Sequence, residues 1–539
     1  MVVINKIPSR SSYDVVVIGG GHNGLVAAAY LARGGLSVLV LERRAVLGGA
    51  AATEEVFPGY RVNTGAGDAG MFLPEILEDL NLENHGLQFI ESPIITLALQ
   101  AEGRPLPLWR ERKRAVEEIA CFSEGDAARY AAFLKDVQGY TEVLGGMRTL
   151  TPPSIPNYHY RELLPWLRAG LDLKRMGDAE MMAFMRVLPM PIAEFLDEWF
   201  ETPILKAALG ITGVAGSMQG PRSAGTTFTF LYQALGAGEA GFRASRFVRG
   251  GMGKLSEALA KAAQMHGAEI CTGVEAARLQ VGGDRATGLT LGDGEQISAQ
   301  KVVCSADPQR TFFDLVEPAK LEVRFVREVK NIKFRGSTAR VTLALEALPE
   351  FRGLVQISSA VDVIELLSGH IIVCPDLEAL ERAYDEAKYG RFSQKPCLDI
   401  VIPTISDASL APAGKHLMSI DVRYAPYGLK DGTWETAGDA LGNRVVELLE
   451  TYAPGITRLI SQRQVLTPLD YEKVFGLTEG SIFHGQMGLD QLIFMRPVPG
   501  YARYRTPVEN LFLCGAGTHP GGGVTGAPGY NAAREILKG

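Results

Sequence analysis

The sequence lacks several features that would point to particular classes of protein. It has no strong excess of one charge, because 54 Lys and Arg stand against 61 Asp and Glu for a formal net charge of −7. A basic surface for nucleic acid is therefore not expected. It also has no apolar run of about 18 residues and no long apolar core near its start. Neither a membrane-spanning helix nor a secretory signal is expected.

Closely spaced cysteines are also missing. The sequence has no CxxC pair and no compact disulfide or zinc spacing. Metal ligands are therefore not predicted, thiol–disulfide exchange is rejected, and the thiols are expected to be reduced in a cytoplasmic protein. The six cysteines are Cys121, Cys271, Cys304, Cys374, Cys397 and Cys514.

What the chain does have is length and apolar content. Its 539 residues are 46% hydrophobic and 21% charged, as in globular proteins. A chain this long exceeds one simple core, so we expect two domains, built from non-contiguous pieces.

The N-terminal part predicts a dinucleotide site. Residues 13–42 read as a buried strand, a glycine turn, a helix of small residues and a second strand. Gly19, Gly21 and Gly24 form G-x-G-x-x-G in that turn. The first glycine permits the tight turn, the second lets the backbone approach a pyrophosphate, and the third allows close packing of the helix. The pyrophosphate would lie at the positive end of the helix.

Glu42 strengthens this interpretation. It ends the second strand, 18 residues after Gly24, where a carboxylate can accept hydrogen bonds from both ribose hydroxyls. It would repel a 2′-phosphate, which disfavours NADP. The plain alternative is a surface glutamate after an ordinary glycine turn.

A second glycine-rich segment lies near the C-terminus. Residues 514–524 read CGAGTHPGGGV between a predicted strand and a predicted helix. Their backbone amides can face something flat or anionic, and an isoalloxazine ring is the best candidate. This segment favours FAD over NAD, whereas the alternative is a flexible loop without function.

Changes in pattern along the chain predict a discontinuous organisation. Residues 1–98, 246–315 and 478–539 have α/β character and are assigned to one Rossmann-like FAD-binding domain. Residues 99–245, with helices and proline punctuation, and residues 316–477 are assigned to an inserted mixed α+β substrate domain. The fold class is therefore α/β.

Six ordered blocks carry a family resemblance. The chain resembles the phytoene desaturase superfamily of FAD-dependent flavoproteins, including desaturase-like β-carotene ketolases and flavoproteins named for a pyridine nucleotide-disulfide oxidoreductase domain. The blocks are GGGHNGLVAAAYLARGG, LERRAVLGGAAATEE, GGMGKLSEALAKAA, SADP, FHGQMGLDQLIFMRP and GAGTHPGGGVTGAPGYNAA.

The resemblance implies roles for particular residues in a flavoprotein fold of the GR2 type. The N-terminal glycines and Glu42 would hold the ADP half of FAD, with Val274 beside the adenine. Many relatives have R-x-G-G-R around the double glycine, whereas here Val46 and Ala50 flank it, so Arg43 or Arg44 is expected to replace that phosphate contact. The remaining predicted cofactor contacts are Gly48, Gly49, Thr53, Gly515, Gly517, Thr518, Gly522, Gly523 and Val524.

His519 is the candidate catalytic residue, as a group that orients the flavin or the substrate. The alternative is a loop histidine that hydrogen-bonds the backbone. His484 and Asp490 are expected to brace the crossing between domains. Hydride transfer to a flavin needs little beyond a C–H bond held over the ring in a dry pocket, so no conspicuous catalytic triad is expected.

The segment 161–200 bears on the substrate. Its methionines suit an irregular apolar ligand, although helix packing explains them equally well. Arg168, Lys174 and Arg175 would let this segment rest on an anionic bilayer, or they form a solvated basic face. The methionines are Met176, Met181, Met182, Met185 and Met190.

We therefore expect an enzyme that oxidises an apolar, isoprenoid or carotenoid-like small molecule by hydride transfer to FAD. Oxygen or a quinone would accept the electrons, because a second nucleotide-binding unit is missing. One alternative is an amine-oxidase-like activity, for which Phe494, Tyr501 and Tyr504 do not make a recognisable aromatic cage. The other is a non-catalytic flavin-binding scaffold protein. The sequence does not predict the oligomeric state, and peripheral membrane contact is compatible with it.

Overall fold

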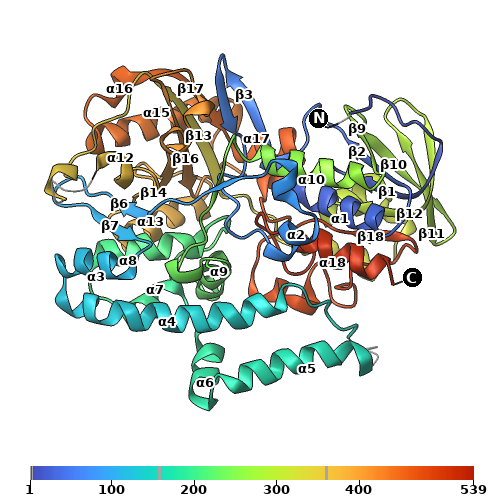
Figure 1. Ribbon diagram of the computed structural model, residues 1–539, viewed down its shortest axis with the longest axis horizontal. Coiled ribbons are helices and arrows are strands. Elements are labelled where there is room, and N and C mark those ends of the chain that lie inside the picture. Colours follow the sequence, from blue (N-terminus) through green and yellow to red (C-terminus); the bar gives the residue numbers. More distant parts are fainter. Residues whose placement is uncertain (1, 3, 156–159, 358–361, 539) are drawn as a thin grey trace.

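The fold rests on two seven-stranded sheets, which lie in separate lobes (Figure 1). The computed structural model describes residues 2, 4–155, 160–357 and 362–538. The first sheet occupies the lobe that also holds the two ends of the chain, and the second sheet occupies the other lobe. Segments from both halves of the sequence build each sheet.

The first sheet has a parallel centre. Its order is β10-β11-β12-β1-β2-β9, with β18 paired to β12. β1 pairs in parallel with β2 and β12, β2 with β9, and β12 with β18, whereas β10, β11 and β12 are antiparallel. The strands are β1 (Ser12–Ile18), β2 (Val38–Glu42), β9 (Glu269–Thr272), β10 (Ala276–Gly282), β11 (Arg285–Leu291), β12 (Gln296–Cys304) and β18 (Leu511–Leu513).

Apolar strands and small-residue helices explain the packing of this lobe. β2 is buried along its whole length, as expected for a parallel strand covered on both faces. Helix α1 (His22–Arg33) packs against α10 (Gly253–Met265) and α18 (Ala527–Ile536). The pairing of β2 with β9 confirms that the segment after residue 246 packs with the N-terminal unit.

The second sheet is mostly antiparallel, in the order β17-β13-β16-β15-β14-β6-β7. It already begins at residue 94, so the predicted boundary at residue 98 falls at the end of one of its strands. Strand alternation alone could not place β6, because both of its faces are buried. The strands are β6 (Ile94–Ala98), β7 (Leu106–Trp109), β13 (Thr338–Leu345), β14 (His370–Val373), β15 (Leu398–Val401), β16 (His416–Arg423) and β17 (Ile460–Leu466).

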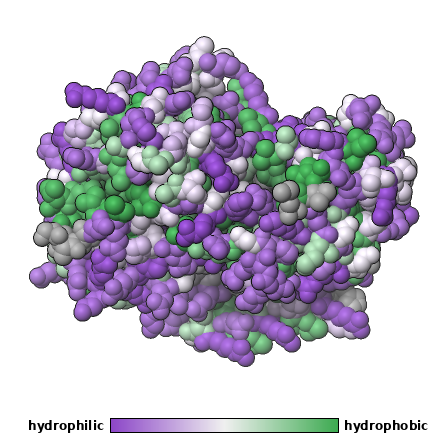
Figure 2. All heavy atoms as spheres, turned by 45° about the horizontal axis from the view of Figure 1, so that its top comes forward, coloured by the Kyte–Doolittle hydropathy of each residue, from purple (hydrophilic) through white to green (hydrophobic). Residues whose placement is uncertain are grey.

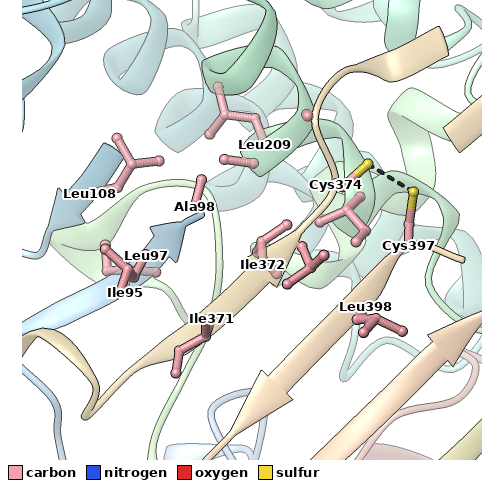
Figure 3. Close-up of a cluster of buried hydrophobic side chains, with 14 of the residues drawn as sticks. Ile95, Leu97, Ala98, Leu108, Leu209, Ile371, Ile372, Cys374, Cys397 and Leu398 are labelled. Atoms are coloured by element: carbon pink, nitrogen blue, oxygen red, sulfur yellow. Dashed lines mark hydrogen bonds between the residues drawn. The ribbon is translucent and has the colours of Figure 1, made fainter. Parts of the chain in front are cut away.

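Two thiols meet in the core of this sheet. The Sγ atoms of Cys374 and Cys397 lie 3.0 Å apart just beyond the paired ends of β14 and β15 (Figure 3). Their separation in the sequence concealed this proximity. The hydrogen bond with Cys397, together with burial, raises the pKa of the Cys374 thiol well above its usual value. A protonated, buried thiol is a poor nucleophile, which agrees with the rejection of thiol–disulfide exchange.

Helices dominate residues 112–233, as predicted. They are α3 (Arg112–Ala120), α4 (Glu124–Met147), α5 (Tyr160–Arg175), α6 (Asp178–Val187), α7 (Ile192–Asp197), α8 (Pro203–Gly210) and α9 (Thr226–Gln233). α5 and α6 lie outside α4, away from both sheets (Figure 1). Within the described residues, no helix is long and apolar enough to cross a membrane.

Shorter elements complete the two lobes. Hydrophilic residues cover most of the face in Figure 2, and hydrophobic ones gather in patches on the lobe of the second sheet. The hairpin β3 (Thr53–Phe57) and β4 (Tyr60–Asn63) and the pair β5 (Phe89–Ile90) and β8 (Phe247–Val248) are separate from both sheets. The other helices are α2 (Pro74–Asp79), α11 (Val323–Lys330), α12 (Val363–Leu366), α13 (Leu377–Lys388), α14 (Pro403–Ser406), α15 (Trp434–Tyr452), α16 (Ile456–Leu459) and α17 (Pro468–Phe475).

Candidate functional site

A cavity of about 540 Å³ opens where the parallel strands of the first sheet end. Residues that follow β1, β2, β9 and β12 form one wall. α17 and the segments around residues 482–484 and 516–524 form the opposite wall. Ligands of open α/β sheets bind at the carboxyl ends of the strands, and this volume is ordinary for a small-molecule site.

The N-terminal glycine turn lies in the cavity wall, and its geometry suits an anion. Gly19 has a φ of 99°, which favours glycine. A Cβ on Gly24 would stand 2.1 Å from the carbonyl oxygen of Gly19, so the third glycine allows close packing. A Cβ on Gly21 would meet only the carbonyl oxygen of Gly48, at 4.0 Å. The space beside Gly21 is therefore open to a ligand.

The helix that follows this turn leaves its first N–H groups available. α1 begins at His22, and its N-cap Gly21 has no side chain with which to accept their hydrogen bonds. Gly48 and Gly49 also line the cavity, with φ values of 110° and 56°. The N–H of Gly48 donates to the carbonyl oxygen of Gly20 at 2.8 Å, which fixes the double glycine beside the turn. An uncapped helix N-terminus at a cavity is a ready site for phosphate.

Glu42 is held in place by the backbone. Its Oε2 accepts the N–H of Gly20 at 2.8 Å and its Oε1 accepts the N–H of Arg44 at 2.8 Å. Each carboxylate oxygen has a further lone pair, so the group can still accept from a ligand. The N–H of Val274 donates to the carbonyl oxygen of Glu42 at 2.9 Å, and both residues line the cavity.

The two arginines after β2 separate. Arg43 lines the cavity and donates from Nη2 to the carbonyl oxygen of Val474 at 3.0 Å. Arg44 points away, because its Nη2 pairs with both oxygens of Glu54 at 2.7 and 2.8 Å. Of the two predicted phosphate contacts, only Arg43 is positioned for that role. Thr53 is also outside the cavity lining, and its Oγ1 accepts the N–H of Gly253 at 2.8 Å.

The C-terminal glycine segment reaches the cavity only in part. Gly523 and Val524 line it, whereas the other predicted contacts in this segment do not. A Cβ on Gly522 would stand 2.2 Å from Cδ1 of Phe483, and one on Gly517 would stand 2.6 Å from Cδ of Pro308. The structure therefore assigns these glycines to close packing of the loop. The residues outside the lining are Gly515, Gly517, Thr518, His519 and Gly522.

His519 is buried beside α4 instead of facing the cavity. Its Nε2 lies 3.0 Å from the carbonyl oxygen of Met147, and the hydroxyl of Tyr504 donates to its own carbonyl oxygen at 3.1 Å. Burial lowers the pKa of His519 to about 4, so the ring is neutral at pH 7. This geometry matches the alternative of a loop histidine bonded to the backbone, and it gives no direct contact with the cavity.

Several lining residues were not predicted. His22 stands inside the glycine motif, hydrogen-bonds the backbone of Gly523, and has its pKa lowered by burial to about 4. His484, expected to brace the chain, lines the cavity, and burial lowers its pKa to about 3. Ser305 belongs to the SADP block and was therefore detectable. Tyr471 and Phe475 on α17 had no signal in the sequence.

These residues fit FAD. The open space at Gly21, the uncapped start of α1 and the carboxylate at the end of β2 suit a pyrophosphate followed by a ribose. When bound, FAD supplies a ring that accepts a hydride. The chain holds the cofactor between two walls, and Phe483 and the neutral His484 exclude charge from the wall beside Gly523 and Val524.

Comparisons with known proteins agree with this site. Residues 24–346 match the model of the family described as flavin containing amine oxidoreductase. The chain is 36% identical to pyridine nucleotide-disulfide oxidoreductase domain-containing protein 2 of Rattus norvegicus, over 98% of this chain and 94% of the rat protein. It is 28% identical to a component of the limonene dehydrogenase of Castellaniella defragrans, over 97% and 94%. It is 25% identical to a lycopene-forming phytoene desaturase of Pantoea ananas, over 97% and 98%.

Solved structures show the same fold at low identity. An oxidoreductase from Methanosarcina mazei matches with a TM-score of 0.59 at 14% identity, over 97% of this chain and 100% of that chain. Putrescine oxidase bound to putrescine matches with a TM-score of 0.58 at 14% identity, over 98% of each chain. The predicted α/β flavoprotein fold and the phytoene-desaturase-like relationship are confirmed. The chain belongs to the flavin containing amine oxidoreductase family, and within it is a phytoene-desaturase-like, FAD-dependent oxidoreductase.

Proposed function

We propose that the protein oxidises an apolar, isoprenoid-like molecule by hydride transfer to FAD. The observation that carries the proposal is the end of the cavity at residues 482–484, 516, 523 and 524. Ile482, Phe483, His484, Ala516, Gly523 and Val524 line this end, and none of them is a carboxylate. Its histidine is neutral at pH 7 because burial lowers the His484 pKa to about 3. Such a wall accepts an uncharged hydrocarbon and offers an ammonium group no partner.

The names of two relatives support the same substrate class. Limonene and phytoene, which those names specify, are both isoprenoid hydrocarbons. Both proteins match this chain over 97% of its length. The chemistry requires that a C–H bond be held over the flavin in a dry pocket, and an apolar wall provides this without an acid–base triad.

An amine substrate is less well supported, because the aromatic candidates do not meet. Tyr501 packs edge-on against Phe325 with ring centroids 5.0 Å apart. Tyr504 is buried and donates its hydroxyl to the carbonyl oxygen of His519. Phe494 is 38% exposed. These three side chains serve separate environments and form no cage around an ammonium group.

An anaerobic reduction experiment tests the proposal and its two rivals. The FAD-loaded protein is mixed with limonene, with phytoene in detergent, or with putrescine, and the flavin absorbance is followed. We expect one of the hydrocarbons to bleach the flavin and putrescine to leave it unchanged. Bleaching by putrescine alone would support an amine oxidase. Chemically reducible flavin that none of the three bleaches would support a non-catalytic flavin-binding protein. Oxygen and a soluble quinone are then compared as reoxidants.

The outer helices suggest how an apolar substrate reaches the protein. We further propose that α5 rests on an anionic phospholipid bilayer. Leu164, Leu167 and Leu171 lie on one face of α5 and are 53%, 60% and 57% exposed. Arg161, Arg168 and Arg175 recur every seven residues along the edge of this face, in a chain of net charge −7. Exposed leucines beside basic side chains are typical of a helix that lies in a membrane interface.

Vesicle co-sedimentation tests this docking surface. L164E/L171E should lose binding to vesicles containing phosphatidylglycerol, while V355E should keep it, because Val355 is 94% exposed elsewhere. Met182 and Met185, at 64% and 55% exposed, lie on α6 and extend the apolar surface; they do not line the cavity. Equal binding by the two variants would overturn the proposal. A change of oligomeric state with no vesicle binding would assign the face to a second copy of the chain.

A further inference from the structure

Arg496 is a buried cation with no acidic partner. Its side chain is 1% exposed. Its Nε and Nη2 donate to the carbonyl oxygen of Ala516 at 3.1 and 2.8 Å, and Nη2 also donates to the carbonyl oxygens of Phe483 and Gly485. Its Nη1 is buried without a hydrogen-bond partner. In the described part of the chain, no carboxylate lies within ion-pair distance of it.

Burying an unpaired guanidinium is costly, because the charge loses its hydration and gains no opposite charge. Burial lowers the pKa of Arg496 to about 10, so the group still carries its charge at pH 7. The charged or titratable groups that influence it are Tyr232 and Asp490, and Asp490 is exposed to solvent. The carbonyl oxygens satisfy part of the hydrogen bonding but leave the net charge in place.

This charge lies directly behind the cavity wall. Two of the residues whose carbonyl oxygens it binds, Phe483 and Ala516, line the cavity beside Gly523 and Val524. The nearby titratable side chains are neutral at pH 7, because burial lowers the pKa values of His484 and His519 to about 3 and about 4. Arg496 therefore dominates the electrostatic potential at this end of the cavity, in a region of low dielectric constant where a charge acts strongly.

We propose that Arg496 is the fixed countercharge for the reduced flavin: through the cavity wall, its positive charge raises the reduction potential of bound FAD and stabilises the anionic reduced form. Reduction adds negative charge to the ring, and a preorganised cation favours that state without reorganisation. The inference rests on FAD binding in this cavity and is independent of the substrate proposed above.

The geometry also shows why a side chain is needed for this task. The sequence suggested that the amides of Gly522, Gly523 and Val524 would stabilise the reduced ring. In the structure the N–H of Gly522 donates to Sδ of Met487 at 3.3 Å, so one of these donors is already occupied. A full charge behind the wall supplies the potential that partial charges on the remaining amides would supply only weakly.

Two measurements on the FAD-loaded protein test the proposal without any substrate. The first is the reduction potential of the bound flavin. The second is the dissociation constant for sulfite, whose sulfur lone pair adds to the oxidised ring and leaves a negative charge on it. The variants are R496M, which removes the charge, R496K, which keeps a cation, and R534M as a control. Arg534 is an exposed arginine on α18, so R534M makes the same change of net charge at the surface.

We expect R496M to lower the potential and to weaken sulfite binding by at least about tenfold, equivalent to about 1.4 kcal/mol. R496K, measured at pH 6, should stay close to the wild type, and R534M should match it. Equal sulfite binding by R496M and the wild type would overturn the proposal. So would an R496K protein as weak as R496M, because geometry and not charge would then be responsible. If R496M does not fold, the wild type decides: a potential at or below that of free FAD contradicts the proposal.

Discussion

Two glycine-rich turns border the same cavity, yet their glycines have different tasks. Each follows a strand of the first sheet and leads into a helix, α1 in one case and α18 in the other. At Gly21 a Cβ would project toward open space, with its nearest neighbour at 4.0 Å. At Gly522 a Cβ would stand 2.2 Å from the ring of Phe483. The first turn is open toward a ligand, whereas most of the second is closed by packing against the protein itself.

Glycine content alone therefore does not identify a binding loop. A glycine near a cavity can make room for a ligand or for a neighbouring side chain, and only the atoms opposite its Cα decide between them. Gly523 is the exception in the second turn, because it lines the cavity and has a φ of 87°. Four substitutions should separate the two turns, and the first of them should have the strongest effect.

Gly21→Val should act most strongly, on FAD binding. Its side chain would occupy the space assigned to the pyrophosphate, so we expect affinity for FAD to fall by about a hundredfold or more, equivalent to about 2.8 kcal/mol. Flavin released on denaturation measures this directly. Gly146→Val is the matched control, because no atom lies within 4 Å of a Cβ at that position on α4. An unaltered flavin content in Gly21→Val would show that the first turn does not contact the cofactor.

Gly522→Ala should act on stability instead of on affinity. The added methyl group must displace Phe483, and overpacking of this kind costs about 1–3 kcal/mol. We expect a lower midpoint in urea denaturation, with FAD bound to each folded molecule as in the wild type. Loss of FAD from a protein of normal stability would instead return this glycine to the binding loop that the sequence suggested.

Glu42→Gln should weaken FAD binding moderately. The carboxylate accepts N–H groups on both oxygens, and an amide would place an NH₂ group against one of these donors. We expect FAD affinity to fall about tenfold, within the roughly 1–3 kcal/mol cost of an unsatisfied buried group. Titration of the apoprotein with FAD measures it. Glu55→Gln on β3 provides the control, and equal affinity in the two variants would contradict the role of Glu42.

The buried histidine of the second turn should affect acid stability. Burial lowers the folded-state pKa of His519 to about 4 from its usual value of 6.5. Its stabilising contribution is therefore complete above pH 6.5 and is lost as the pH falls toward 4, because the unfolded chain binds the proton first. Between about pH 7 and pH 5, His519→Gln should lose less unfolding free energy than the wild type while retaining FAD. An identical pH dependence in both proteins would refute the burial of a neutral ring.

The first turn was largely predictable, because its chemistry is local. The spacing of Gly19, Gly21 and Gly24 and the position of Glu42 at the end of β2 are contained in 24 consecutive residues, and the structure puts all four in the cavity wall. Val274 was reachable through the family blocks, and it lies just after β9, the parallel neighbour of β2.

The opposite wall was not predictable from spacing. Arg44 stands beside Arg43 in the sequence, but the carboxylate of Glu54, ten residues on, draws it away from the cavity. α17 reaches the site from the inserted segment, and its Tyr471 and Phe475 have no motif. Arg496 gave no signal either, because only tertiary folding reveals that a surface-type residue is buried without a counterion. Contacts between distant segments decide these cases, and single-sequence patterns do not encode them.

A crystal structure of the protein with FAD bound would decide whether this cavity is the flavin site. We predict electron density for the pyrophosphate beside the backbone of Gly21 and His22, for the ribose at Glu42 and for the adenine near Val274. The isoalloxazine ring should lie against Gly523 and Val524, with Phe483 and Ala516 between it and Arg496. Density that leaves the turn at Gly21 empty, or that places the ring away from the wall in front of Arg496, would contradict this assignment.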